Sequence, residues 1–153
     1  MAYLHTCRGC CLHYALRLAT VITQTRASRT RVLLLEPNAS LRTAIETILA
    51  AEEYNVEPCE SLQQLIVLGQ HSTRTVALAA WQSMEGLLAE EHRPDLVQLT
   101  RRLRLVLMVP RRWARLLETT DLHEAVAGMV AKPFEAEELL SALRIALRAP
   151  AGN

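Results

Sequence analysis

Residues 31–42 read Arg-Val-Leu-Leu-Leu-Glu-Pro-Asn-Ala-Ser-Leu-Arg, and this stretch decides the fold class. Four consecutive apolar residues that stop at Glu36 are typical of a short strand buried on both faces. Apolar residues then repeat at helical spacing, at Leu41, Ile45, Ile48 and Leu49. We therefore expect a helix over 39–53, with Asn38 or Ser40 as its N-cap.

The alternation of strand and helix continues to the end of the chain. Further strands are expected over 55–59, 75–81, 105–109 and 129–131. Further helices are expected over 62–69, 86–91, 95–102, 113–126 and 135–148, the fourth of them broken. Pro94 separates the second from the third, which leaves one kinked helix or two short ones. Pro58 cannot donate to a neighbouring strand, so its strand should lie at a sheet edge. The pattern predicts one doubly wound α/β domain, a five-stranded parallel sheet with helices on both faces.

Length and composition allow one folded domain and little else. The chain has 153 residues, of which 50% are hydrophobic and 22% charged, which excludes wholesale disorder and a membrane bundle. The formal net charge is only +1, yet residues 1–35 hold five arginines and no acid. We expect a basic lead-in over 1–29, either disordered or the product of a start codon placed too early, a domain over 30–148 and a tail over 149–153.

Cysteine usage points to a reducing compartment. Three of the four cysteines crowd the N-terminus, which is not a disulfide framework. Two histidines join them to give five candidate zinc ligands: His5, Cys7, Cys10, Cys11 and His13. A second pair of ligands at zinc-site spacing is missing, so we expect no metal there. Charges interrupt every apolar window long enough to span a bilayer, so we expect a soluble, cytoplasmic protein with no membrane partner.

In a doubly wound sheet the working site lies beyond the carboxyl ends of the strands. Four short stretches occupy those ends in this chain: 36–38, 80–82, 109–110 and 132–133. The search for a function is therefore confined to these strand ends.

The last of these stretches carries a family resemblance. Lys132-Pro133-Phe134, followed by Glu137-Glu138-Leu139-Leu140, resembles the end of the receiver domain of two-component response regulators, and Lys132 is the only lysine beside sixteen arginines. Residues 31–42 and 83–86 are similar to two other stretches of that family, so the resemblance covers about residues 30–148. It implies a flavodoxin-like fold and a cis peptide bond before Pro133.

The resemblance also implies a chemistry, namely phosphoryl transfer from a histidine kinase to an aspartate at the end of the third strand. That reaction needs a carboxylate nucleophile, acids that hold Mg²⁺, and a lysine and a hydroxyl that receive the phosphate. This chain departs from the pattern at four positions. Ala80 or Trp81 stands at the acceptor position, Pro37 replaces the second acid, Val109 stands at the switch hydroxyl and Met129 at the switch aromatic.

Glu36, Lys132 and Pro133 are all that remains of the family's pocket. We expect Glu36 and Lys132 to form an ion pair, because both follow or end strands at the same sheet edge. Six arginines cluster around the fourth strand: Arg101, Arg102, Arg104, Arg111, Arg112 and Arg115. Without interleaved aromatic residues we expect them to form a solvated rim, and we expect Trp81 and Trp113 to serve packing.

These observations predict a degenerate receiver-like module that acts by protein–protein interaction, without aspartyl phosphorylation, enzymatic activity, cofactor or metal. The expected partner is another signalling protein or a second copy. The family resemblance places the contact surface on the fourth helix, the fifth strand and the last helix, with His123, Glu137, Ser141 and Arg144 as candidates. The alternatives are an unorthodox phosphorelay receiver, a pocket that binds a small ligand, and a nucleic-acid adaptor that uses the arginines and the lead-in; we do not expect nucleic acid.

Overall fold

The computed structural model describes residues 30–70, 75–89, 92–117 and 122–148. Expectations for the lead-in and the tail, including the five candidate zinc ligands, lie outside these residues. The strands are β1 (Arg31–Leu35), β2 (Asn55–Pro58), β3 (Thr75–Ala80), β4 (Arg104–Pro110) and β5 (Gly128–Lys132). The helices are α2 (Ala39–Ala51), α3 (Leu62–Gly69), α4 (Trp81–Leu88), α5 (Arg93–Arg102), α6 (Arg111–Leu117), α7 (Leu122–Ala125) and α8 (Ala136–Arg148).

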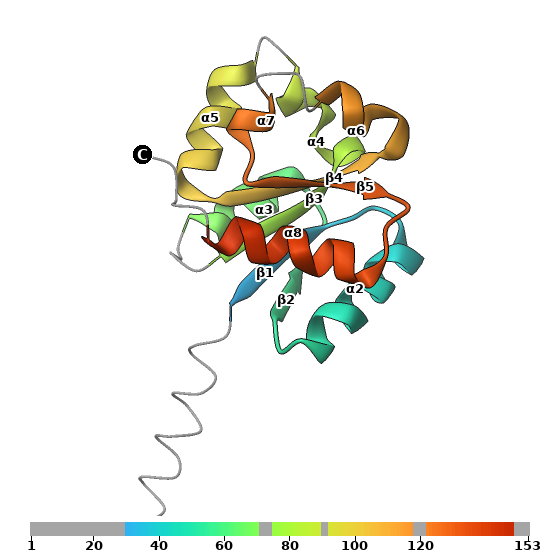
Figure 1. Cartoon of the computed structure of the whole chain (residues 1–153). Coiled ribbons are helices and arrows are strands. Elements are labelled where there is room, and N and C mark those ends of the chain that lie inside the picture. The colour runs from blue at the N-terminus through green and yellow to red at the C-terminus, as the bar shows by residue number, and fades with distance from the viewer. Residues whose placement is uncertain (1–29, 71–74, 90–91, 118–121, 149–153) are drawn as a thin grey trace, which may run out of the picture.

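The five strands form one parallel sheet in the order β2-β1-β3-β4-β5, which confirms the expected doubly wound fold (Figure 1). Helices α2 and α8 cover one face, and α3, α4, α5, α6 and α7 cover the other. Because β2 lies on one side of β1 and β3 lies on the other, strand order reverses between β1 and β3. The loops that hold the candidate site therefore meet at the carboxyl edge of the sheet.

Two apolar layers hold the helices on the sheet. On one face, the even-numbered residues of β1, β3 and β4 pack against Ile45 and Leu49 of α2 and Leu139 and Leu143 of α8. On the other face, the odd-numbered residues pack against α3, α4, α5 and α7. This alternation follows from the period of two in a strand. It also lets the face of each strand-end residue be assigned.

The edge strands match the sequence expectation. β2 lies at one edge, pairs only with β1 and ends at Pro58, whose nitrogen has no hydrogen to donate. β5 forms the other edge and is partly exposed at four of its five residues. The three central strands are almost fully buried, as continuous apolar runs predict.

Two expected boundaries are wrong. Helix α2 ends at Ala51, because Glu53 adopts a left-handed φ of 61° and donates its N–H to the carbonyl of Ala50. Strand β3 ends at Ala80, and Trp81 already opens α4, so the helix expected over 86–91 begins five residues earlier. Of the two arrangements expected around Pro94, the structure has two short helices, α4 and α5, and Pro94 lies in the first turn of α5, where its missing N–H costs nothing.

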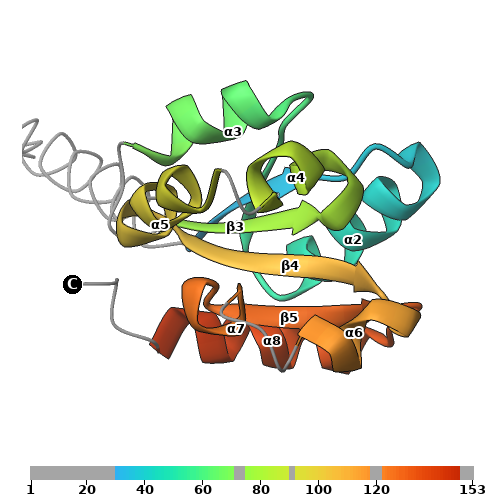
Figure 2. The same cartoon turned by 90° about the horizontal axis from the view of Figure 1, so that it is seen from above.

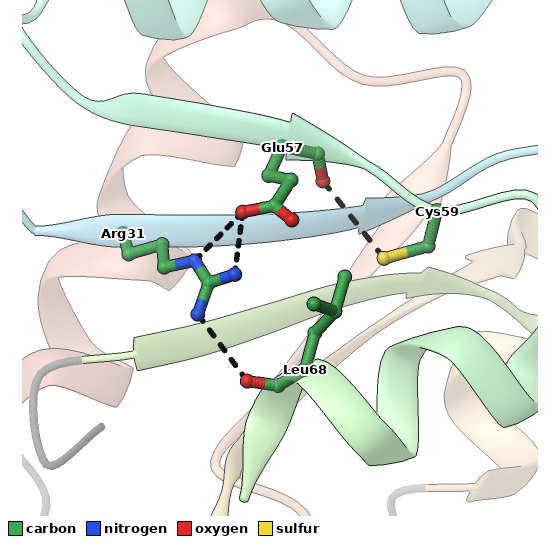
Figure 3. Close-up of polar contacts among 4 residues, drawn as sticks. All are labelled: Arg31, Glu57, Cys59 and Leu68. Carbon is green, nitrogen blue, oxygen red and sulfur yellow. Dashed lines mark hydrogen bonds and ion pairs between the residues drawn. The ribbon is translucent and has the colours of Figure 1, made fainter. Parts of the chain in front are cut away.

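The amino end of the sheet is fastened by Arg31 (Figure 3). Its Nε donates to Glu57 Oε2 of β2 at 2.9 Å, and its Nη1 donates to the carbonyl of Leu68 in the last turn of α3 at 3.2 Å. A cation is favourable at this helix end, where carbonyls lack partners. One side chain thus links β1, the edge strand and a covering helix. Among the described residues no helix is long and apolar enough to cross a bilayer.

Candidate functional site

The candidate site lies where β1, β3, β4 and β5 end, and Arg31 lies at the other end of the sheet, where β1 begins. Figure 2 shows the ends of β3, β4 and β5 on the same side of the molecule. Leu35 pairs in register with Ala79, and Pro110 pairs with Lys132. Glu36 follows β1 directly, so its backbone lies level with Ala80. The parallel register therefore gathers residues that are up to 96 positions apart in the sequence.

Glu36 is the buried centre of this edge, with 1% of its surface exposed. Its Oε2 accepts a hydrogen bond from Lys132 Nζ, and its Oε1 accepts one from the backbone N–H of Asn38 at 3.0 Å. Its carbonyl oxygen accepts from Arg42 Nη1 at 2.9 Å. The predicted ion pair of Glu36 and Lys132 is confirmed, and both carboxylate oxygens are engaged within the chain.

The alternation of faces corrects one assignment. Lys132 shares the face of Val130, which packs with α2 and α8, and Ala80 lies on the same face. Val109, which we expected beside the pocket, is fully buried in the cluster on the opposite face. The residue of β4 that lies level with Lys132 is Pro110, whose ring carries no hydroxyl. Met129 also packs on the opposite face.

No nucleophile stands at the acceptor position. Ala80 is the last residue of β3 and is fully buried, so it offers one methyl group. Trp81, the first residue of α4, is partly buried and packs against the core cluster. Neither side chain can form an acyl phosphate, which requires a carboxylate oxygen.

The residues at this edge do not fit a magnesium ion. Mg²⁺ prefers six oxygen ligands, among them carboxylates. Pro37 supplies none from its side chain, and Glu36 already uses one oxygen for Lys132 and the other for Asn38. Across the described residues, no group of three or more histidine, cysteine, aspartate or glutamate side chains could hold a metal ion.

Two tryptophans cover this end of the sheet, an arrangement that the sequence did not predict. Trp81 at the start of α4 stacks on Trp113 of α6, with ring centroids 6.3 Å apart and planes inclined by 17°. The guanidinium carbon of Arg112 lies 5.9 Å from the Trp113 ring centroid. Trp81 packs on the core as expected, and Trp113 packs on Trp81 while 38% of its surface stays exposed.

The six clustered arginines do not form one rim. Arg101, Arg102 and Arg104 lie where α5 ends and β4 begins, whereas the other three lie on α6 beyond the far end of β4. A seven-residue strand is about 20 Å long at about 3.3 Å per residue. The expected basic stretch is therefore two separate patches.

Three of the four residues expected at the contact surface lie on α8. Glu137, Ser141 and Arg144 are exposed on α8, and Arg144 Nη1 donates to Glu137 Oε1 at 2.8 Å. Arg144 Nη2 also lies 3.8 Å from Oε2 of Glu52, which follows the last residue of α2. His123 lies in α7, and its side chain is outside the described part of the structure.

Comparison with known proteins rests on structure alone, since no family model and no curated protein matches the chain. The signal receiver domain of a putative Luxo repressor protein from Vibrio parahaemolyticus superposes with a TM-score of 0.62 at 18% identity, over 78% of this chain and 91% of that one. The receiver domain of a sensor histidine kinase from Pseudomonas aeruginosa, described with magnesium coordinated in its active-site cleft, gives 0.59 at 18% identity over 80% and 100%.

The chain has the response-regulator receiver fold. A third structure with this fold, from the streptococci, is described as a redox sensor evolved from two-component response regulators. It matches with a TM-score of 0.61 at 18% identity, over 78% of this chain and 51% of that one. In the receiver-like domain of the present chain, the peptide bond between Lys132 and Pro133 is cis, as the resemblance implied.

Proposed function

We propose that this receiver-like domain is a signalling module that works by binding another protein, without aspartyl phosphorylation and without enzymatic activity. The observation that supports the proposal most strongly is the state of Glu36. Glu36 is the one acid that the chain retains from the family's pattern, and it is buried. Its two carboxylate oxygens accept hydrogen bonds from Lys132 Nζ and from the backbone N–H of Asn38.

The chemistry of the residues at the carboxyl ends of the strands is the reason that the proposed function does not include phosphoryl transfer. In a receiver, the lysine stabilises the charge of the newly formed phosphate, and the acids hold the metal that gathers this charge. Here Lys132 neutralises Glu36 inside the domain, and Ala80 presents a methyl group where the nucleophile is needed. The pair supports the sheet edge and performs no transfer.

Binding is supported by the surface of α8. This helix buries Leu139, Leu143 and Ala146 and presents a charged, exposed side that includes Glu137 and Arg144. The fold is also found in a protein described as a redox sensor, so its use extends beyond proteins described as receivers. We place the partner surface on α7, β5 and α8.

An exchange of charges tests this surface. The double variant Glu137→Arg with Arg144→Glu keeps opposite charges at these two positions but inverts the charge pattern that a partner meets. It also replaces the contact of Arg144 with Glu52 by two acids, so the free energy of unfolding of the variant is measured beside its binding. We expect association, measured by pull-down from source-cell extract and by light scattering of the purified chain, to weaken about tenfold or more.

A matched exchange elsewhere serves as the control. Glu60→Arg with Arg101→Glu changes two exposed residues outside α8 and also leaves the net charge unchanged. This variant should associate as the wild type does, and the circular dichroism of both variants should be unchanged. Full association of the α8 variant would move the contact to another surface.

A further inference from the structure

Beyond the α8 surface, a second surface patch lies on α6 at the carboxyl edge of the sheet. We call it the Arg-Trp patch and define it as Trp81, Arg111, Arg112, Trp113 and Arg115. Its aromatic part joins the ends of two central strands, because Trp81 follows β3 and α6 follows β4. Figure 2 shows α4 beside the end of β3 and α6 directly after the end of β4.

The patch is positively charged and open to solvent. Arg111, Arg112 and Arg115 are exposed, and helix α6 contains no acid. None of the three forms an ion pair with another residue in the described ranges. Three guanidinium groups within two helical turns, with no acidic partner among the described residues, create a local field that an anionic group would complement.

The tryptophans give this charged patch a rigid apolar centre. Trp81 is held by the core and stacks on Trp113, so Trp113 is fixed on one side while 38% of its surface stays exposed. Tryptophan and arginine are the residue types that most often dominate the binding energy at protein interfaces. A tryptophan that is already packed on one side loses less conformational entropy on binding than a free one.

The charge of the whole domain restricts the kind of partner. Residues 30–148 hold 13 basic and 16 acidic residues, a net charge of −3, so the domain as a whole does not attract a polyanion. Nucleic acid needs a continuous basic track along its backbone. The nearest other arginine cluster in the described chain lies about 20 Å away, at the opposite end of β4. A short acidic segment fits the small patch better.

We propose that the Arg-Trp patch binds a short acidic segment of a partner protein, whose carboxylates pair with the arginines of α6 and whose apolar side chains contact Trp113. The inference rests on the proposed function, a module that works by protein binding, and adds the chemistry of the partner. It uses a surface other than the one tested by the α8 exchange.

The two tryptophans of the chain are both in the patch, so their fluorescence reports on it directly. The probe is a ten-residue peptide of eight glutamates and two leucines, and its control has glutamines in place of the glutamates. Titrating the full chain with the acidic peptide should change the tryptophan emission saturably. The change should disappear at about 1 M salt, where the screening length is about 3 Å. The glutamine peptide should bind at least tenfold more weakly.

Charge reversal locates the site. Arg112→Glu with Arg115→Glu should weaken the peptide at least tenfold, whereas Arg101→Glu with Arg102→Glu, at the far end of β4, should not. The comparison of the two peptides uses the wild-type chain, so it stays decisive if a variant fails to fold.

Three results would overturn the inference: no saturable change, equal binding of the glutamine peptide, or equally tight binding of a single strand of twelve thymidines. The titration contains no phosphodonor and no magnesium, and it does not depend on α8. A failure here is therefore distinct from a failure of the proposed function.

Discussion

At the scale of single residues, Glu36 and Lys132 are the pair on which the carboxyl edge depends. Glu36 is buried, and the side chain of Lys132 is 18% exposed, so each charge relies on the other. A buried pair is costly to form but costlier to break, because removal of one partner leaves an uncompensated charge. The pair therefore constrains the positions of β1 and β5.

Lys132→Ala should lower the free energy of unfolding by about 3 kcal/mol, the cost of breaking a buried pair from one side. Urea denaturation measures this loss. The double variant Glu36→Gln with Lys132→Met removes both charges, and its free energy of unfolding should fall clearly less than that of Lys132→Ala. A change within about 0.5 kcal/mol for Lys132→Ala would show that the pair does not support the fold.

Cys59 is a buried thiol at the end of β2 (Figure 3). Burial raises its pKa, the charge of Glu57 raises it further, and Arg31 opposes them. The folded state therefore favours the neutral thiol. This contribution to stability is present below the pKa of the unfolded thiol, about 8.5, and is lost as the pH rises through the pKa of the folded thiol.

We therefore expect slow alkylation of Cys59. In the full chain with Cys7, Cys10 and Cys11 replaced by serine, iodoacetamide at pH 8 should react at least tenfold more slowly than with the same chain in urea. Intact mass measures the rate. Equal rates in both states would contradict the burial of this thiol.

At the scale of elements, the sequence indicates the strands better than the helix boundaries. Continuous apolar runs locate the three central strands, since a strand buried on both faces admits few polar residues. Helix ends depend on single residues whose conformation is set by tertiary contacts, as at Glu53. The same limit explains why the start of α4 at Trp81 was missed.

The start of α2 offers a direct test of a helix cap. Asn38 Oδ1 accepts a hydrogen bond from the backbone N–H of Leu41 at 3.0 Å. Asn38→Ala should cost about 1 kcal/mol in the free energy of unfolding, while Asn38→Ser, which retains an acceptor, should cost clearly less. Thermal unfolding compares them, and equal stability of all three chains would exclude a capping role.

The site itself was only partly predictable. The ion pair follows from parallel topology, which brings the ends of β1 and β5 to one edge. Val109 was misassigned because a shift of one residue along a strand moves the side chain to the other face. The stack of Trp81 on Trp113 could not be predicted, because it depends on how α6 packs after β4.

At the scale of the whole molecule, the described domain closes both of its core clusters with residues from β1 to α8. Deletion of residues 1–29 should therefore change the free energy of unfolding by no more than an ordinary surface change, about 0.5 kcal/mol. Thermal unfolding of the shortened and full chains measures it. A loss well beyond about 2 kcal/mol would mean that the lead-in packs on the domain.

The central claim is that the receiver fold is used here without phosphoryl transfer, and intact mass spectrometry tests it most directly. The full chain is incubated with a small phosphodonor and magnesium, beside an active receiver domain as positive control. We predict no added phosphoryl group, because Ala80 supplies no nucleophile and the oxygens of Glu36 are engaged by Lys132 and Asn38. A gain of one phosphoryl group that requires magnesium and disappears in Glu36→Ala would contradict the account and show that this is an active receiver.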